Sequence, residues 1–273
     1  MKIGVFDSGL GGLIILWAIR KFLPQYDYVY LGDTKRVPYG NRSQNTVFRF
    51  TREAVDYLFR KENCALVIVA CNTSSAKALR KIQQEYLLKN FSDRRVLGVL
   101  IPAAEDAAKY SKIGILATKG TVKSGTFPIE IKKVNRKVPA LNSRGSSTKV
   151  GTKIWQTPAP RLVSLAEAGE YHLAGVYIKK YLAPLVAKKI EVLVLGCTHY
   201  PLFKKEFKKV LPKNIKIVSQ DEIIPKKLKI YLGNHPEINK KLSRNKKMKI
   251  LVTKKTNKWT LWQKSGSLVR RQN

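Results

Sequence analysis

In the first third of the chain, short apolar runs alternate with longer amphipathic segments. Residues 46–61 place apolar side chains at helical spacing, at Val47, Phe50, Ala54, Tyr57 and Leu58, which predicts a helix with one buried face. The apolar runs are shorter and rich in β-branched residues, which favours strands. We therefore predict strands over 3–6, 28–31 and 65–70, and helices over 13–22, 46–61 and 74–88.

The same alternation starts again near residue 96. Apolar runs at 96–100, 113–117, 192–195 and 215–218 predict strands, and the segments 103–109, 173–188 and 202–211 predict helices, the second of them bent near Pro184. Strands that alternate with helices are typical of α/β proteins with mostly parallel sheets. We expect two similar three-layer α/β domains, the first formed by 1–96 plus 212–273 and the second by 97–211.

Two segments do not fit this alternation. Residues 139–152 are rich in Ser, Gly and Lys, which predicts an exposed loop. After Asn239 the chain is dominated by Lys and polar residues, and only 250–252 resembles a strand. Trp259, Leu261 and Trp262 are the side chains expected to pack this tail against the body.

Composition places the chain among globular proteins. Its 273 residues are 44% hydrophobic, enough for a large core. The N-terminus lacks the regions of a signal peptide, and no apolar stretch has the length of a membrane span. Three cysteines without close pairs favour neither a disulfide framework nor a zinc site. We expect a cytoplasmic protein without membrane association, metal or other cofactor.

The charge is unusual for such a protein. Fifty-three Lys and Arg against 18 Asp and Glu leave a net charge of +35, and residues 202–273 hold 21 basic and four acidic residues. Such a field attracts polyanions and small acids. Most of these charges are interpreted as a solvated surface, with nonspecific polyanion binding as a further prediction.

Reactive and polar residues follow three predicted strands. They are Asp7 and Ser8 after the first, Cys71 with Asn72 after the third, and Cys197 with Thr198 and His199 after the strand at 192–195. In open α/β sheets, ligands bind at the carboxyl ends of strands. The two cysteine segments echo each other, which predicts a pair of thiols that face one pocket.

Facing thiols suit the inversion of a stereocentre. Racemisation removes a proton from one face of a carbon and returns one to the other, so a base and an acid are needed on opposite sides. A thiol serves as the base when a helix N-terminus or an imidazolium lowers its pKa from about 8.5. We expect Asn72 and Thr73 to cap the helix after Cys71, and His199 and Asp7 to assist the thiols. Cys64 is interpreted as core packing, and the glycine turn at 9–12 as a substrate-binding loop.

Four sequence blocks resemble those of bacterial glutamate racemases, in order and in spacing, over about residues 1 to 238. They are DSGLGG at 7–12, VPYGNRS at 37–43, ACNT at 70–73 and LGCTHYP at 195–201. The resemblance implies two α/β domains with the active site between them, and a cofactor-independent enzyme that supplies D-glutamate for peptidoglycan. It also implies that Cys71 acts on D-glutamate and Cys197 on L-glutamate.

The resemblance assigns the remaining site residues as well. Glu167 is similar to an auxiliary acidic residue of the family, and a homodimer is a further expectation. The residues that fall on substrate-binding positions of the family are Ser8, Tyr39, Gly40, Asn72, Thr73, Thr118, Thr121 and Thr198. Asp7 and His199 are expected to bind the substrate as well.

The chain also departs from the racemase pattern. The differences are Ile14, the segments 158–160 and 219–221, the insertion at 139–152 and the end of the chain after Val252. They bear on stability, oligomer contacts and regulation. Three other interpretations stay open: a racemase of aspartate or a related acid, a nucleic-acid-binding protein on a racemase scaffold, and a damaged paralogue.

Overall fold

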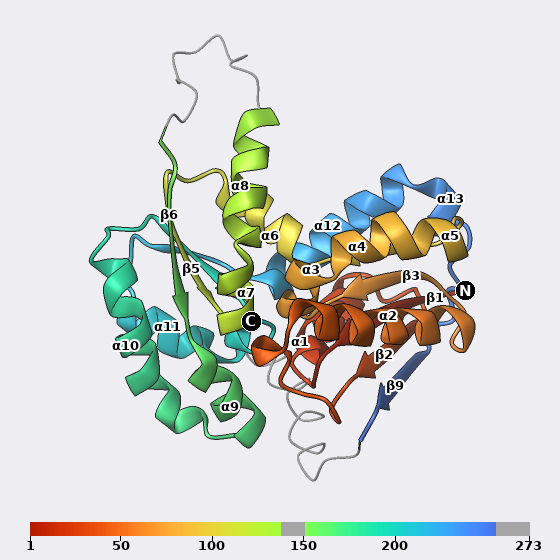
Figure 1. Ribbon diagram of the computed structural model, residues 1–273, viewed down its shortest axis with the longest axis horizontal. Coiled ribbons are helices and arrows are strands. Elements are labelled where there is room, and N and C mark those ends of the chain that lie inside the picture. The colour runs from red at the N-terminus through yellow and green to blue at the C-terminus, as the bar shows by residue number, and fades with distance from the viewer. Residues whose placement is uncertain (138–150, 255–273) are drawn as a thin grey trace.

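The computed structural model of the protein describes residues 1–137 and 151–254. Almost all of the predicted loop at 139–152 lies outside the described residues. The expected packing by Trp259, Leu261 and Trp262 lies outside them as well. The described residues form two parallel sheets, and the helices cover both faces of each (Figure 1).

The first sheet has five parallel strands in the order β4-β3-β1-β2-β9. Its last member shows that the apolar residues at 250–252 do belong to a strand, which forms the edge of the sheet beside β2. The strands are β1 (Lys2–Asp7), β2 (Tyr28–Gly32), β3 (Cys64–Val69), β4 (Arg95–Gly98) and β9 (Met248–Val252).

The second sheet has four parallel strands in the order β6-β5-β7-β8. It repeats the connectivity of the first sheet, because in each the first strand lies between its second and third. The strands are β5 (Lys112–Ala117), β6 (Lys153–Pro158), β7 (Val192–Gly196) and β8 (Lys216–Val218). β6 was not predicted from the sequence, because its mixed polar residues give it no clean apolar run.

Helices bury both faces of each sheet. On the first sheet, α1 (Gly12–Phe22) and α12 (Gln220–Asn234) cover one face, and α2 (Gln44–Arg60) with the broken helix at 72–90 covers the other. That broken helix consists of α3 (Asn72–Lys77), α4 (Leu79–Lys81), a π-helical turn (Ile82–Leu87) and α5 (Leu88–Asn90). It was predicted as one continuous helix.

On the second sheet, one face is covered by α6 (Leu100–Ala107) and α8 (Thr126–Lys137). The other is covered by α9 (Pro160–Ala168), α10 (Ala174–Val186) and α11 (Lys204–Val210). The expected two three-layer α/β units are therefore confirmed, and we call them the first and second lobes. Shorter helical segments are Tyr39–Asn41, α7 (Lys119–Ser124), Tyr171–Leu173, Tyr200–Phe203 and α13 (Pro236–Asn239).

Each lobe contains one helix that directly follows a strand of the other lobe, and we call these two the exchanged helices. α6 follows β4 of the first sheet but packs on the second sheet, and α12 follows β8 of the second sheet but packs on the first, where it contacts α1. In Figure 1, α6 lies between the two sheets, and α12 starts near the junction of the lobes and runs across the first lobe toward α13. Each lobe therefore buries apolar residues that directly follow a strand of the other.

Both points at which the chain passes between the sheets differ from the sequence prediction. The predicted boundary at residue 96 cuts through β4, which pairs with β3 throughout. The expected return to the first half near residue 212 is one strand too early, because β8 pairs with β7 in the second sheet. Both strands are short and lie at sheet edges, so their apolar patterns do not reveal which sheet they join.

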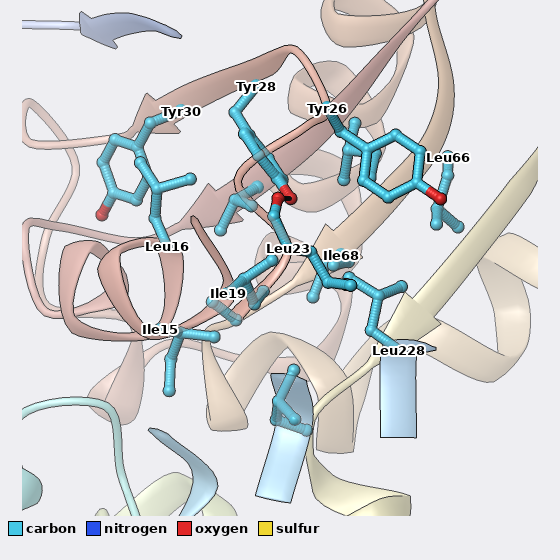
Figure 2. Close-up of a cluster of buried hydrophobic side chains, with 14 of the residues drawn as sticks. Ile15, Leu16, Ile19, Leu23, Tyr26, Tyr28, Tyr30, Leu66, Ile68 and Leu228 are labelled. Atoms are coloured by element: carbon cyan, nitrogen blue, oxygen red, sulfur yellow. Dashed lines mark hydrogen bonds between the residues drawn. The ribbon is translucent and has the colours of Figure 1, made fainter. Parts of the chain in front are cut away.

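Three tyrosines, Tyr26, Tyr28 and Tyr30, lie among aliphatic side chains in the core on the α1 face of the first sheet (Figure 2). Tyr28 and Tyr30 are almost fully buried, and buried hydroxyls need partners. Tyr28 donates to the Leu23 carbonyl at 2.6 Å and Tyr30 to the Gly9 carbonyl at 2.8 Å. Tyr30 thereby ties the core to the loop that follows β1.

The exchanged helix offers a matched pair of stability variants. Leu228 of α12 is 3% exposed in the core of the first lobe, whereas Ile230 on the same helix is 59% exposed. We expect Leu228→Ala to lower the free energy of unfolding by about 2–5 kcal/mol, because it leaves a cavity. Ile230→Ala should change it by less than about 0.5 kcal/mol. Urea denaturation measures both, and equal losses would contradict the packing described here.

Candidate active site

The strand order of each lobe brings polar residues to one edge of its sheet. In the first sheet, β1 and β3 are neighbours, so Ser8 and Cys71 follow adjacent strand ends. In the second, β5 and β7 are neighbours, so Thr118 and Cys197 do the same. At both places the chain leaves adjacent strands in opposite directions, which opens a crevice for ligands.

A cavity of about 110 Å³ lies where these strand ends meet. Both Cys71 and Cys197 line it, although each thiol comes from a different lobe. Most of the residues predicted for the site are brought together here. Those that line the cavity are Ser8, Tyr39, Gly40, Cys71, Asn72, Thr73, Thr118, Cys197, Thr198 and His199.

Three predicted residues lie behind the cavity wall instead. Asp7 is fully buried, where it accepts a hydrogen bond from Gly9 N at 3.0 Å and one from Thr198 Oγ1 at 3.4 Å. Thr121 Oγ1 lies 3.0 Å from Thr118 Oγ1 and supports it. Glu167 contacts the imidazole of His199. These residues position the lining groups rather than face the cavity.

Other residues that line the cavity were not predicted. Val37, Pro38 and Asn41 belong to the block at 37–43, so the motif itself could have indicated them. Lys119 follows Thr118 directly and places a cation at the cavity. α9 contributes Pro160, Val163 and Ser164. The same helix carries the predicted Glu167, but no pattern in the sequence marked these three.

Two glycines allow the lobes to approach on either side of the cavity. A Cβ on Gly11 of the first lobe would lie 2.6 Å from Thr198 Oγ1 of the second. A Cβ on Gly120 of the second lobe would lie 2.4 Å from the Gly40 carbonyl oxygen of the first. The turn at 9–12 thus packs against the second lobe. We expected this turn to bind the substrate, but its glycines do not line the cavity.

Cys71 itself caps the helix that follows it. Its Sγ accepts a hydrogen bond from Ser74 N at 3.5 Å and donates one to Ser8 Oγ at 3.3 Å. The prediction that Asn72 and Thr73 cap this helix is wrong, because both already lie within α3. Burial raises the pKa of the Cys71 thiol, and the nearby Asp7 raises it further. This sulfur is therefore held as a neutral thiol, against the expectation of a lowered pKa.

Cys197 has a different environment. Its Sγ lies 3.6 Å from His199 Nδ1, and His199 Nε2 lies 2.6 Å from Glu167 Oε1. Burial would lower the pKa of His199, but its hydrogen bonds with Cys197 and Glu167 outweigh this and raise the pKa well above 6.5. An imidazolium beside Cys197 stabilises negative charge on that sulfur.

Among the residues that the structure describes, no group of three or more His, Cys, Asp or Glu side chains is arranged to hold a metal ion. In the same part of the chain, no helix is long and apolar enough to cross a membrane.

Two parallel-sheet lobes, each with a thiol at the shared cavity, define an α/β enzyme of the racemase class. Residues 15–220 match the family described as Asp/Glu/Hydantoin racemase, and the chain belongs to this family. It is 40% identical over 217 residues to a glutamate racemase from Persephonella marina, covering 78% of this chain and 75% of that protein.

Solved structures agree with the sequence relatives. The glutamate racemase from Francisella tularensis in complex with D-glutamate has a TM-score of 0.82 at 29% identity, covering 97% of this chain and 92% of that one. The Escherichia coli glutamate racemase in complex with L-glutamate and the activator UDP-MurNAc-ala has a TM-score of 0.73 at 26% identity, covering 99% and 94%.

The raised pKa of His199 gives a prediction for pH dependence. The stability that the protonated imidazole contributes is present in full below the unfolded pKa of about 6.5. It is lost as pH rises through the higher folded pKa. In NMR titrations His199 should therefore stay protonated above pH 6.5. Glu167→Gln should lower its pKa, because the carboxylate that supports the charge is removed.

Glu170→Gln is the matched control, because Glu170 is exposed just beyond the same helix. It should leave the titration of His199 unchanged. If Glu167→Gln also leaves the titration of His199 unchanged, Glu167 does not stabilise the positive charge of His199.

Proposed function

We propose that this enzyme is a glutamate racemase, which interconverts L-glutamate and D-glutamate with Cys71 and Cys197 as its two bases. The observation that carries the proposal is that two thiols, each from its own lobe, line one small cavity. Relatives named glutamate racemase support the choice of substrate. D-glutamate made in this way would supply peptidoglycan synthesis.

In the proposed cycle, one thiol is charged and the other is neutral before substrate binds. Cys71 is a neutral thiol, whereas Cys197 lies beside the protonated His199. A Cys197 thiolate would remove the Cα proton of L-glutamate, and the Cys71 thiol would donate its proton to the opposite face. The product is D-glutamate, and the enzyme is left with a Cys71 thiolate and a Cys197 thiol, the form that accepts D-glutamate.

The cavity wall offers suitable partners for a small dicarboxylic amino acid. Hydroxyl groups of Ser8, Thr73, Thr118 and Thr198 can donate to carboxylates, and the Asn72 amide can both donate and accept. Lys119 adds a positive charge at the same cavity. These groups would hold the substrate by its ends and leave Cα between the sulfurs.

Removal of either thiol should abolish racemisation. Cys71→Ala and Cys197→Ala each leave one face of Cα without an acid or base, so the rate should fall by at least roughly 10²–10⁴-fold. Circular dichroism of L-glutamate incubated with each variant measures this. Cys64→Ala is the control, because Cys64 lies in the core packed against α2. Cys64→Ala should retain racemase activity as long as the variant folds.

Full activity in Cys71→Ala or Cys197→Ala would exclude the two-base mechanism. Faster turnover of L-aspartate than of L-glutamate by the unaltered enzyme would favour the aspartate alternative. We expect dialysis against a chelator to leave the rate unchanged, and a loss of activity that a metal ion restores would contradict a thiol-only mechanism.

The net charge of +35 supports a second, weaker proposal. We infer that the surface binds polyanions without sequence preference, by the release of counterions from the polyanion. DNA binding should then fall steeply between low and physiological salt, while racemisation changes far less. No binding at low salt would leave the charge as a solvated surface, and salt-resistant, sequence-specific binding would favour the nucleic-acid alternative. Formation of a homodimer stays a prediction.

A further inference from the structure

Two buried amide side chains pair beside the Cys71 thiol. Asn72 Nδ2 donates to Gln220 Oε1 at 2.7 Å, and Gln220 Nε2 donates to Asn72 Oδ1 at 2.6 Å. Asn72 is 2% exposed and Gln220 is 1% exposed. The pair joins the residue after Cys71 to the first residue of the exchanged helix α12. The segment at 219–221 is one of those that depart from the racemase pattern.

An isolated amide pair of this kind does not determine its own polarity. If both side chains turned over together, the same two hydrogen bonds would form with donors and acceptors exchanged. Here a third contact removes this freedom, because Gln220 Nε2 also lies 3.3 Å from the Val99 carbonyl oxygen and donates to it. The backbone carbonyl requires the nitrogen of Gln220 on its side, and this in turn fixes the oxygen of Asn72.

Val99 and Gln220 lie where the chain changes lobes. Val99 lies between β4 and α6, and Gln220 begins α12 just after β8. Gln220 therefore bonds to the other crossing segment and to Asn72 at once. Asn72 lines the cavity, whereas Gln220 does not. The orientation of an amide in the cavity wall thus depends on a residue at the junction of the lobes.

We propose that Gln220 is a positioning residue, which sets the direction of the Asn72 amide toward the substrate and couples it to the crossing segments. This inference rests on the proposed racemase activity, since Asn72 is taken as a substrate contact. Two hydrogen bonds with Gln220 occupy one edge of the Asn72 amide. The second N–H and the remaining lone pair stay available for the ligand.

Gln220→Leu is the central variant, because it removes all three hydrogen bonds at a similar side-chain size. Without them the Asn72 amide can present either end to the substrate. The KM for glutamate should rise roughly tenfold, since a misplaced polar partner costs about one hydrogen bond in binding. The kcat should fall much less, because both thiols keep their positions. Gln220→Glu should be at least as harmful, since its carboxylate faces the Val99 carbonyl without a donor.

Gln83→Leu is the control for the loss of a glutamine hydrogen bond to a backbone carbonyl, and Gln83 is half-buried. Gln83 Nε2 donates to the carbonyl of Val96 in β4 at 2.7 Å, but Gln83 does not line the cavity. Both variants should lower the melting temperature. Only the Gln220 variant should raise the KM. If the role of Gln220 were merely structural, the two variants would behave alike.

A double variant tests whether Gln220 acts through Asn72. Asn72→Ala by itself should raise the KM. Adding Gln220→Leu should raise the KM no further, because the amide that Gln220 orients is already absent. Independent, multiplying effects would overturn the proposal, as would a KM in Gln220→Leu equal to that of Gln83→Leu. If the unaltered enzyme does not racemise glutamate, the proposed function fails instead, and this result is distinct from either outcome.

Discussion

The structure depends on one requirement, that two thiols from separate sheets stand across a single small cavity. Neither lobe can satisfy this requirement alone, because each carries only one of the two strand ends that lead to Cys71 and Cys197. The relative placement of the lobes therefore determines the site. The exchange of α6 and α12 stabilises this placement, since each lobe completes its core with a helix that follows a strand of the other.

The close contacts around the cavity follow from the same requirement. Gly11 and Gly120 have no side chains, so the loops of the two lobes can pack against each other beside the site. The bond from Thr198 to Asp7 and the pair formed by Asn72 and Gln220 join residues far apart in the chain. Polar contacts of this kind fix directions that apolar packing leaves free.

The alternation of apolar runs and amphipathic segments was sufficient to predict two three-layer α/β units. Cys71 and Cys197 could be singled out because each follows a buried strand and the two segments echo each other. Asp7 was found at a strand end, and Thr121 and Glu167 were found by resemblance, but the sequence could not show that all three lie behind the cavity wall. Their positions depend on tertiary packing, which has no local pattern.

Other features could not be predicted from the sequence, and each has a physical reason. β6 has mixed polar residues, and β4 and β8 are short edge strands, so nothing local assigns them to a sheet. The pKa of Cys71 was expected to be lowered by its helix, yet burial and Asp7 raise it. Gln220 drew notice only as a departure from the racemase pattern, because its partners Asn72 and Val99 are more than a hundred residues away.

The central claim is that two different thiols serve the two faces of Cα, and solvent hydrogen exchange tests it most directly. L-glutamate is incubated in D₂O with the enzyme, and both enantiomers are analysed by mass spectrometry early in the reaction. The account predicts D-glutamate with deuterium at Cα, since the proton comes from a solvent-exchanged thiol, while the remaining L-glutamate keeps its protium. D-glutamate that retains protium, or L-glutamate that gains deuterium as fast as product forms, would contradict it.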